Sequence, residues 1–350
     1  MKLLIFVTGR GTGGDAAIAY NVSKALENQN IETKIVLDPS APGYYFQKRN
    51  ISWLKSSIPA AGGHASSKST LLKAGFKTIT AMISGARLIK KEKADGVIGT
   101  IGGGAVIGCL SAKLARVPAV GIVSTPTDTK ISMKLNSTLV LPESPLFTKE
   151  LGNTKYPTEK QFMPIKLDVM EGNKENIISQ LPSQYNSSRM SVLFASGSTL
   201  FDDMAKAARR YAEENDDKNI FVIGEPLKEE LEEVLDHPNI MNLGYINYVP
   251  DLYDLIDLAI ITDDGLTLHE TLACEIPVVV VLGVKYGRYH GLAQTFEGAV
   301  LESNVDDISE KVNSALDNYD NMKEATKKYS KGIINGANDL TNFVINQISK

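Results

Sequence analysis

The fold of this chain is decided by three consecutive segments: Asn242-Leu-Gly-Tyr-Ile-Asn-Tyr248, Ile260-Ile-Thr-Asp-Asp-Gly-Leu-Thr-Leu-His-Glu270 and Ile276-Pro-Val-Val-Val-Val281. The last two predict a short buried strand, a turn rich in Asp and Gly, a helix around Thr267, and a fully apolar strand. Strands that alternate with helices form parallel sheets, which bind ligands at the carboxyl ends of their strands. We therefore expect a ligand site here, where the carboxylate of Glu270 can accept two hydrogen bonds from a ribose diol.

The same alternation of strands and helices occurs twice along the 350 residues. One hydrophobic core rarely supports a chain of this length, so two domains are expected. Strands are predicted at 3–8, 33–38, 96–100, 119–123 and 138–141, and again at 191–195, 219–223, 240–243, 258–262 and 278–282. Four prolines among polar residues at 143–188 predict the passage between the domains. We predict an α/β protein with two Rossmann-like, doubly wound domains, 1–165 and 166–335, followed by an amphipathic stretch at 336–350.

Cysteine use and the lack of long apolar runs indicate a cytoplasmic protein. Cys109 and Cys274 are the only cysteines, and both fall in apolar stretches, so a disulfide framework is not expected. The N-terminal apolar run ends at Thr8, too early for the core of a signal peptide, and no later run approaches a membrane span. The expected location is the cytoplasm, where the protein can at most lie on the inner face of the cell membrane.

Charge divides the chain into a basic half and an acidic half. Residues 1–165 contain 21 Lys and Arg against 10 Asp and Glu, whereas residues 166–350 contain 16 against 31. Either this difference has no function, or the basic half meets a phosphorylated substrate or an anionic membrane. Residues 68–93 carry seven Lys and Arg among apolar side chains, which predicts either a helix on a membrane or a helix packed on its own sheet. Nucleic acid is not expected, because no binding motif organises the basic residues.

The first of three glycine-rich turns, Thr8-Gly-Arg-Gly-Thr-Gly-Gly-Asp15, follows a predicted strand and precedes a helix. Glycines in such a turn let backbone N–H groups and a helix N-terminus converge on an anion. The turn also matches the G-x-G-x-x-G pattern of dinucleotide-binding enzymes, with Asp38 where their ribose-binding acid would lie. A nicotinamide enzyme is therefore an alternative, although it would not need a second nucleotide-like site around Glu270.

Two further glycine turns follow predicted strands: Gly102-Gly-Gly-Ala-Val-Ile-Gly108 and Ala195-Ser-Gly-Ser-Thr199. The second turn suits either close packing of a helix on a strand or a ligand site. The third turn is either an ordinary Ser/Thr helix cap or a set of N–H groups that hold a diphosphate.

The order of these parts resembles the UDP-N-acetylglucosamine transferases that complete lipid-linked cell-wall precursors. This MurG-like family has the GT-B fold, in which two Rossmann-like domains face a cleft. Thr267 and Glu270 match the family's G-A-x-T-x-x-E motif, but Asp264 and Gly265 replace its glycine and alanine. The first glycine turn resembles the family's Gly-Thr-Gly-Gly-His turn, with Asp15 in place of the histidine.

The resemblance implies a donor site in the second domain, an acceptor site in the first, and a C-terminal stretch 336–350 that packs back on the first domain. The implied donor-binding residues are Gly197, Ser198, Thr199, Tyr245, Ile246, Gly265, Thr267, Glu270, His290 and Gln294. The implied acceptor-binding residues are Arg10, Gly11, Thr12, Gly13, Gly14, Gly103 and Gly104. Asp15 is the candidate catalytic base, with His64 in the Gly62-Gly-His64 turn as the reserve candidate.

The expected function is an inverting transfer of a sugar, N-acetylglucosamine by resemblance, from a UDP-sugar to a hydroxyl of a lipid-linked or other anionic cell-envelope precursor. The four histidines and two cysteines form no metal-ligand spacing, so neither a metal nor a cofactor is expected. Two alternatives stay open: a UDP-sugar 2-epimerase of the same fold, and a catalytically silent nucleotide-sugar-binding subunit, which Asp15 in place of histidine allows.

Overall fold

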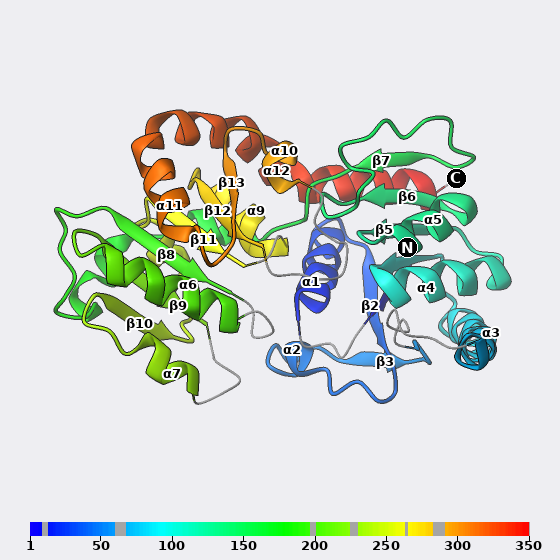
Figure 1. Cartoon of the computed structure of the whole chain (residues 1–350). Coiled ribbons are helices and arrows are strands. Elements are labelled where there is room, and N and C mark those ends of the chain that lie inside the picture. Colours follow the sequence, from blue (N-terminus) through cyan, green and yellow to red (C-terminus); the bar gives the residue numbers. More distant parts are fainter. Residues whose placement is uncertain are drawn as a thin grey trace. The chain divides into compact units, whose positions relative to one another are not determined.

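The computed structural model describes residues 1–8, 13–59, 68–196, 201–224, 230–262, 265–282 and 291–349, with side chains of the helix that begins at Lys68 described from residue 77. The chain forms two compact units: residues 1–164 with 335–350, and residues 165–334. Figure 1 shows the elements of both units. Within the described part of the chain, no helix is long and apolar enough to cross a bilayer.

The first unit is built on a seven-stranded sheet in which all neighbouring strands run parallel. The strand order is β3-β2-β1-β4-β5-β6-β7. This order reverses direction between β1 and β4, the position at which open parallel sheets bind their ligands. The bounds are Lys2–Val7 (β1), Glu32–Leu37 (β2), Trp53–Lys55 (β3), Gly96–Thr100 (β4), Ala119–Val123 (β5), Ser137–Val140 (β6) and Thr158–Lys160 (β7).

Right-handed crossovers determine which face of this sheet each helix covers. α3, α4 and α5 lie in the connections β3 to β4, β4 to β5 and β5 to β6, which all run along the sheet toward β7. These three helices pack side by side on one face. α1 lies in the connection from β1 to β2, which runs in the opposite direction along the sheet, and it therefore covers the other face. The bounds are Gly14–Glu27 (α1), Tyr44–Gln47 (α2), Lys68–Glu92 (α3), Gly102–Ala115 (α4) and Pro126–Leu135 (α5).

The C-terminal helix α12 (Tyr319–Ile348) contributes its last turns to the first unit. Ile348 fills the space beside Gly96, where a Cβ would lie 2.6 Å from the Ile348 side chain. Gln161 donates an Nε2–H to the carbonyl of Gly336 at 3.1 Å. These contacts tie residues 335–348 to the sheet of the first unit.

The second unit is built on a six-stranded parallel sheet with the order β10-β9-β8-β11-β12-β13. Here the order reverses between β8 and β11. α6 and α11 enclose a core around Phe194, Phe201 and Tyr211. The strand bounds are Ser191–Ala195 (β8), Asn219–Ile223 (β9), Ile240–Gly244 (β10), Leu258–Ile261 (β11), Val278–Val281 (β12) and Val300–Ser303 (β13). The helix bounds are Phe201–Glu214 (α6), Glu230–Leu235 (α7), Val249–Tyr253 (α8), Gly265–Ala273 (α9), Leu292–Thr295 (α10) and Ile308–Asp317 (α11).

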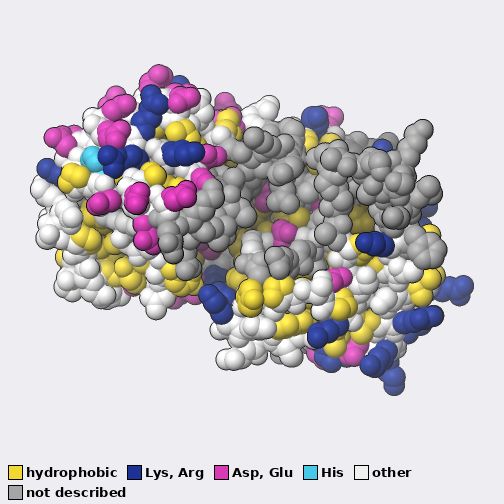
Figure 2. Space-filling view, turned by 60° about the horizontal axis from the view of Figure 1, so that its bottom comes forward, with side chains coloured by type: hydrophobic (Ala, Val, Ile, Leu, Met, Phe, Trp, Pro, Cys, Tyr) yellow, Lys and Arg dark blue, Asp and Glu magenta, His cyan; other side chains and the backbone are white. Residues whose placement is uncertain are grey.

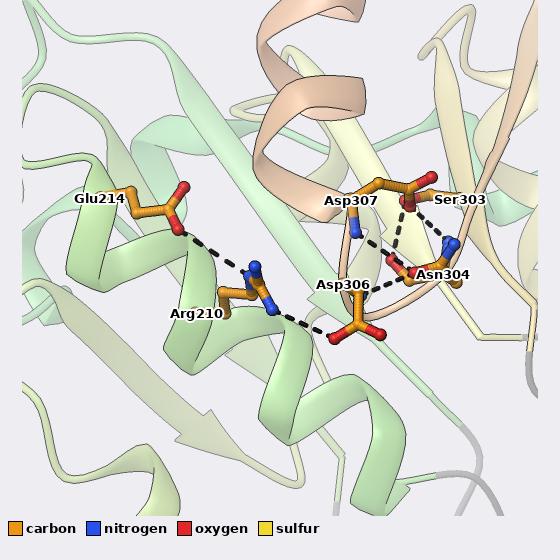
Figure 3. Close-up of polar contacts among 6 residues, drawn as sticks. All are labelled: Arg210, Glu214, Ser303, Asn304, Asp306 and Asp307. Atoms are coloured by element: carbon orange, nitrogen blue, oxygen red, sulfur yellow. Dashed lines mark hydrogen bonds and ion pairs between the residues drawn. The ribbon is translucent and has the colours of Figure 1, made fainter.

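A polar network connects α6 to the turn that begins α11 (Figure 3). Arg210 on α6 forms ion pairs with Glu214 at 3.8 Å and with Asp306 at 3.1 Å. In the turn, Asn304 Oδ1 accepts the N–H groups of Asp306 and Asp307 at 2.7 and 3.2 Å. Because Asp306 is 92% exposed, its ion pair contributes little stability, and the bonds within the turn define the start of α11.

The structure confirms the predicted α/β class with two doubly wound sheets. Each predicted strand is present, and its ends differ from the prediction by at most one residue. Three edge strands, β3, β7 and β13, were not predicted. The segment 143–188, predicted as the passage between domains, contains β7 and the short 3-10 helices η1 (Leu167–Met170), η2 (Lys174–Asn176) and η3 (Ile178–Gln180).

The charge difference follows the two units. The first unit contains 22 Lys and Arg against 11 Asp and Glu, and the second contains 15 against 30. Figure 2 shows acidic side chains gathered over the second unit and basic side chains over the first. The field of the first unit therefore favours anionic ligands.

Candidate functional site

The loops after β8 and β11 begin side by side at the carboxyl edge of the second sheet, because these strands are parallel neighbours, and the strand order reverses between them. Ser196 follows β8, and Thr262 follows β11. Thr262 is buried, and its Oγ1–H donates a hydrogen bond to Ser196 Oγ. This bond joins the two loops at the position where open parallel sheets bind ligands.

Helix α9 begins beside this position and carries the predicted diol-binding residues. Gly265 has a φ of +66°, and no heavy atom lies within 4 Å of where its Cβ would stand. Thr267 and Glu270 are three residues apart, lie on one side of the helix and are half-buried. His269 is fully buried, donates its Nδ1–H to the carbonyl of Gly265 at 2.8 Å, and packs edge-on against Phe296. His269 therefore supports the helix, which leaves Thr267 and Glu270 available to a ligand.

Glu270 has an unusual acidity for a carboxyl group. Burial raises its pKa to about 7, while Lys166 lowers the pKa and Asp168 raises it. The pKa of the Tyr253 phenol is also raised, first by burial and then by the charge of Glu270. A carboxylate that has lost part of its hydration gains from hydroxyl donors that replace the lost water. Lys166 supplies positive charge near this carboxylate, and no motif in the sequence points to it.

Tyr245 stands at the carboxyl end of β10 with 72% of its surface exposed. The preceding Gly244 turns the chain with a φ of +61° and donates its N–H to Asn242 Oδ1 at 3.2 Å. A large exposed ring that is held by a tight turn suits stacking on a planar ligand. Ile246 is half-buried beside it, and Gln294 lies exposed on α10.

The first glycine turn of the first unit leads into α1. Gly13 is the N-cap residue of α1, and its carbonyl accepts the N–H groups of Ala16 and Ala17 at 3.0 and 3.2 Å. No heavy atom lies within 4 Å of a Cβ at Gly13 or Gly14, so nothing in the described part of the chain blocks approach to this backbone. Asp15 is half-buried in the first turn, where the helix dipole favours a carboxylate.

The second glycine turn is explained by close packing. A Cβ at Gly104 would lie 2.6 Å from the carbonyl oxygen of Phe6 and 2.7 Å from the nitrogen of Thr8. A Cβ at Gly103 would lie 3.0 Å from the carbonyl oxygen of Pro59. Both glycines are buried, so they let α4 approach β1, and their contact with an acceptor stays a prediction.

Asp128 on α5 holds this second turn in place. Its carboxylate accepts the N–H of Gly102 at 2.6 Å and the N–H of Thr125 at 2.8 Å. Thr125 and Asp128 also form the capping box that begins α5. Burial raises the pKa of Asp128, and these backbone bonds lower it. Asp128 is a second residue that the sequence analysis missed.

A nicotinamide enzyme would bind a ribose through Asp38, but in this structure the Asp38 carboxylate forms hydrogen bonds within the protein. Its Oδ1 accepts the N–H and Oγ–H of Ser40 at 2.9 and 2.6 Å, and its Oδ2 accepts the N–H of Ile58 at 2.8 Å. The carboxylate therefore fixes the loop after β2. This arrangement does not favour the nicotinamide alternative.

The predicted site residues form one group in each unit. The described residues of the second unit are Tyr245, Ile246, Gly265, Thr267, Glu270 and Gln294, and those of the first are Gly13, Gly14, Asp15, Gly103 and Gly104. The predicted residues that lie outside the described stretches are Arg10, Gly11, Thr12, His64, Gly197, Ser198, Thr199 and His290. Among the described residues, no group of three or more His, Cys, Asp or Glu is arranged to hold a metal ion.

Two family models match this chain. Residues 5–120 match the glycosyltransferase family 28 N-terminal domain, and residues 200–332 match glycosyl transferases group 1. The chain is a glycosyltransferase with the GT-B fold. Among curated proteins, none matches its sequence.

Solved structures share this fold along the whole chain. MurG from Acinetobacter baumannii has a TM-score of 0.68 and 17% identity over 99% of both chains. The spinosyn forosaminyltransferase SpnP has a TM-score of 0.66 and 12% identity, covering 100% of this chain and 99% of its own. The UDP-GlcNAc 2-epimerase from Neisseria meningitidis, bound to UDP-GlcNAc, has a TM-score of 0.64 and 12% identity over 99% and 100%. At identities of 12–17%, the similarity to these structures shows only the fold. The same fold occurs in an epimerase and in transferases.

The raised pKa of Glu270 predicts a pH-dependent difference in stability between the native chain and Glu270→Gln. An ordinary glutamate has a pKa of 4.5, against about 7 for Glu270 in the folded chain. As pH rises from 4.5 to 7, the unfolded chain ionises first, so this residue lowers native stability, fully above pH 7. Across this pH range, we expect the free energy of unfolding of the variant to rise by on the order of 2 kcal/mol relative to that of the native chain. This is less than a fully buried carboxyl would give, because Glu270 is partly exposed.

Urea unfolding at pH 4.5, 6 and 8 measures this difference. Glu233→Gln, at an exposed position on α7, is the matched control, and its difference from the native chain should not change with pH. If the difference in unfolding free energy between Glu270→Gln and the native chain were also independent of pH, the raised pKa of Glu270 would be contradicted.

Proposed function

We propose that this glycosyltransferase moves N-acetylglucosamine from UDP-N-acetylglucosamine to a hydroxyl group of a lipid-linked or other anionic cell-envelope precursor, with inversion at the anomeric carbon. In this proposal the second unit binds the donor and the first unit binds the acceptor. The observation that carries it is Glu270, a half-buried carboxyl on α9, beside the point where the order of the second sheet reverses.

The donor chemistry follows from the groups around Glu270. Ionised Glu270 accepts hydrogen bonds from the two ribose hydroxyls, and the exposed ring of Tyr245 stacks on the uracil. As the bond between the anomeric carbon and the diphosphate breaks, negative charge develops on the leaving UDP. Lys166 and backbone N–H groups stabilise that charge.

The acceptor chemistry needs a base in the first unit. The acceptor hydroxyl oxygen attacks the anomeric carbon from the face opposite UDP, and its proton passes to the base. Asp15 is the candidate, because it lies in the first turn of α1, next to the open backbone of Gly13 and Gly14. His64 remains the reserve candidate.

Helix α3 supports contact with an anionic membrane, which a lipid-linked acceptor requires. Ala81 and Ile89 are buried, and the helix packs on α4. On its outer side, Ile79 and Ile83 are 52% and 37% exposed, one turn apart. Exposed Lys77, Arg87, Lys90 and Lys91 accompany them. Exposed apolar groups among cations favour the surface of an anionic bilayer.

A UDP-sugar 2-epimerase is the second candidate, because two such enzymes, from Neisseria meningitidis and Listeria monocytogenes, share the fold at TM-scores of 0.64 and 0.61. An epimerase would change UDP-N-acetylglucosamine without any acceptor. Incubating the enzyme with this donor alone, and following the configuration at C2 by NMR, distinguishes the two activities. A third possibility, a silent binding subunit, would bind UDP without turning over any acceptor.

We expect Glu270→Ala to lose about 2–3 kcal/mol of UDP affinity at pH 8, the range for hydrogen bonds to a charged group. Calorimetric titration with UDP measures the loss. Glu233→Ala, which removes an exposed carboxylate on α7 of the same unit, should bind UDP like the native chain. Native UDP affinity in a folded Glu270→Ala variant would remove Glu270 from the donor site.

Asp15→Asn should lower kcat by about 10²–10⁴-fold, the usual contribution of a general base, and leave UDP affinity unchanged. The readout is UDP release from UDP-N-acetylglucosamine in the presence of a prenyl-diphosphate-linked sugar. Asn keeps the size of the side chain and is tolerated in a first helical turn, so folding should be unaffected. An active Asp15→Asn enzyme beside an inactive His64→Ala enzyme would transfer the role to His64.

Binding to anionic vesicles should weaken as salt rises, because the attraction between exposed charges is screened. Replacing Ile79 and Ile83 together by Ser should weaken it further, whereas Ile131→Ser, a half-buried position on α5, should not. Co-sedimentation with phosphatidylglycerol vesicles and with phosphatidylcholine vesicles measures both effects. Equal binding to the two vesicle types would end the membrane proposal.

A further inference from the structure

A cavity of about 510 Å³ lies in the first unit between α5 and the segment 144–155. One face of α5 forms a wall, on which Lys130 lies one turn before Met133 and Lys134. Pro145 and Leu146 form much of the opposite wall. The volume falls within the ~300–1,000 Å³ typical of pockets that bind small molecules.

The fold does not need this face of α5 for its own packing. The other side of the helix turns to the sheet, where Ser132 is buried and its Oγ lies 2.8 Å from Thr138 Oγ1. Thr129 Oγ1 lies 3.3 Å from Ser144 Oγ, and both residues are buried, which closes the wall between helix and segment. Met133 is half-buried and lines the cavity, while Leu146 on the opposite wall also packs against the buried cluster of Ala105, Val123 and Val140.

The cavity is basic as well as apolar. Lys130, Lys134 and Lys155 line it and are exposed. None of the described residues that line it is acidic. Two lysines four residues apart on a helix repel each other, and an anion between them would relieve this repulsion.

We propose that this cavity binds a single-chain lipid phosphate, with the chain along Met133, Pro145 and Leu146 and the phosphate at Lys130, Lys134 and Lys155. An apolar wall removes a chain from water, and several ammonium groups suit a multiply charged phosphate better than a neutral head group. The site goes beyond the proposed function, because it requires neither a nucleotide sugar nor an acceptor sugar.

The cavity is connected to the second glycine turn through the start of α5. Pro126 lines the cavity and follows Thr125, which shares the capping box with Asp128. Asp128 in turn holds the N–H of Gly102 in the second glycine turn. Pro126 and Lys130, which line the cavity, are each two residues from Asp128, so a lipid phosphate bound on α5 lies close along the helix to the anchor of that turn.

The test uses the whole chain with ¹³C-methyl-labelled methionine, without UDP, and dodecyl phosphate below its micellar concentration. The chain has nine methionines, and Met133→Leu identifies the Met133 signal. We expect a saturable shift of the Met133 signal. The double variant Lys130→Gln, Lys134→Gln should bind at least tenfold more weakly, and Met133→Glu should not bind.

Two controls keep the result specific. Lys328→Gln with Lys331→Gln makes the same charge change on exposed positions of α12 in the second unit, which do not line the cavity, and should keep native affinity. Inorganic phosphate and dodecanol should each bind at least tenfold more weakly than dodecyl phosphate. A Met133 signal that does not move, an equal loss of affinity in the α12 control, or equally tight binding of inorganic phosphate would overturn the proposal. Because UDP is absent, the outcome is independent of the donor site.

Discussion

Parallel pairing is the constraint on which the rest of this structure depends. Every pair of neighbouring strands in the described sheets is parallel, so all carboxyl ends of a sheet lie on one edge. Each connection must then cross a face of the sheet, and its direction decides which face. The strand order reverses between β1 and β4 and between β8 and β11, and open parallel sheets bind their ligands at such reversals. The first and second glycine turns follow β1 and β4, and α9 follows β11, so each begins at one of these reversals.

The two reversal points are built differently. In the second unit, Thr262 joins the loops after β8 and β11, and no heavy atom lies within 4 Å of a Cβ at Gly265, the first residue of the helix that carries Glu270. In the first unit, Gly104 is packed against β1, whereas no heavy atom lies within 4 Å of a Cβ at Gly13 or Gly14. A half-buried carboxyl lowers stability when it ionises without strong partners. The position of Glu270 is therefore easier to explain by a ligand than by the fold.

The sequence could predict the central strands because each is a short apolar run bounded by Gly, Pro or Asp. It could not predict β3, β7 and β13, which have three or four residues, lie at or near sheet edges and include charged or polar side chains. Glu270 was found because it belongs to a motif close to a strand. Lys166 acts on Glu270 and Asp128 on Gly102, in both cases more than twenty positions away along the chain. No local sequence pattern indicates such a contact. The Thr125-Pro-Thr-Asp128 capping box was visible in the sequence, but it predicts only the start of a helix.

The central claim is that Glu270 binds the ribose of a uridine nucleotide. The most direct test is a double cycle that compares UDP with 2′,3′-dideoxy-UDP on the native chain and on Glu270→Ala, by calorimetry at pH 8. Our account predicts that losing the diol weakens binding to the native chain by about 2–3 kcal/mol and leaves binding to the variant almost unchanged. The same loss with both proteins would mean that the diol is bound elsewhere.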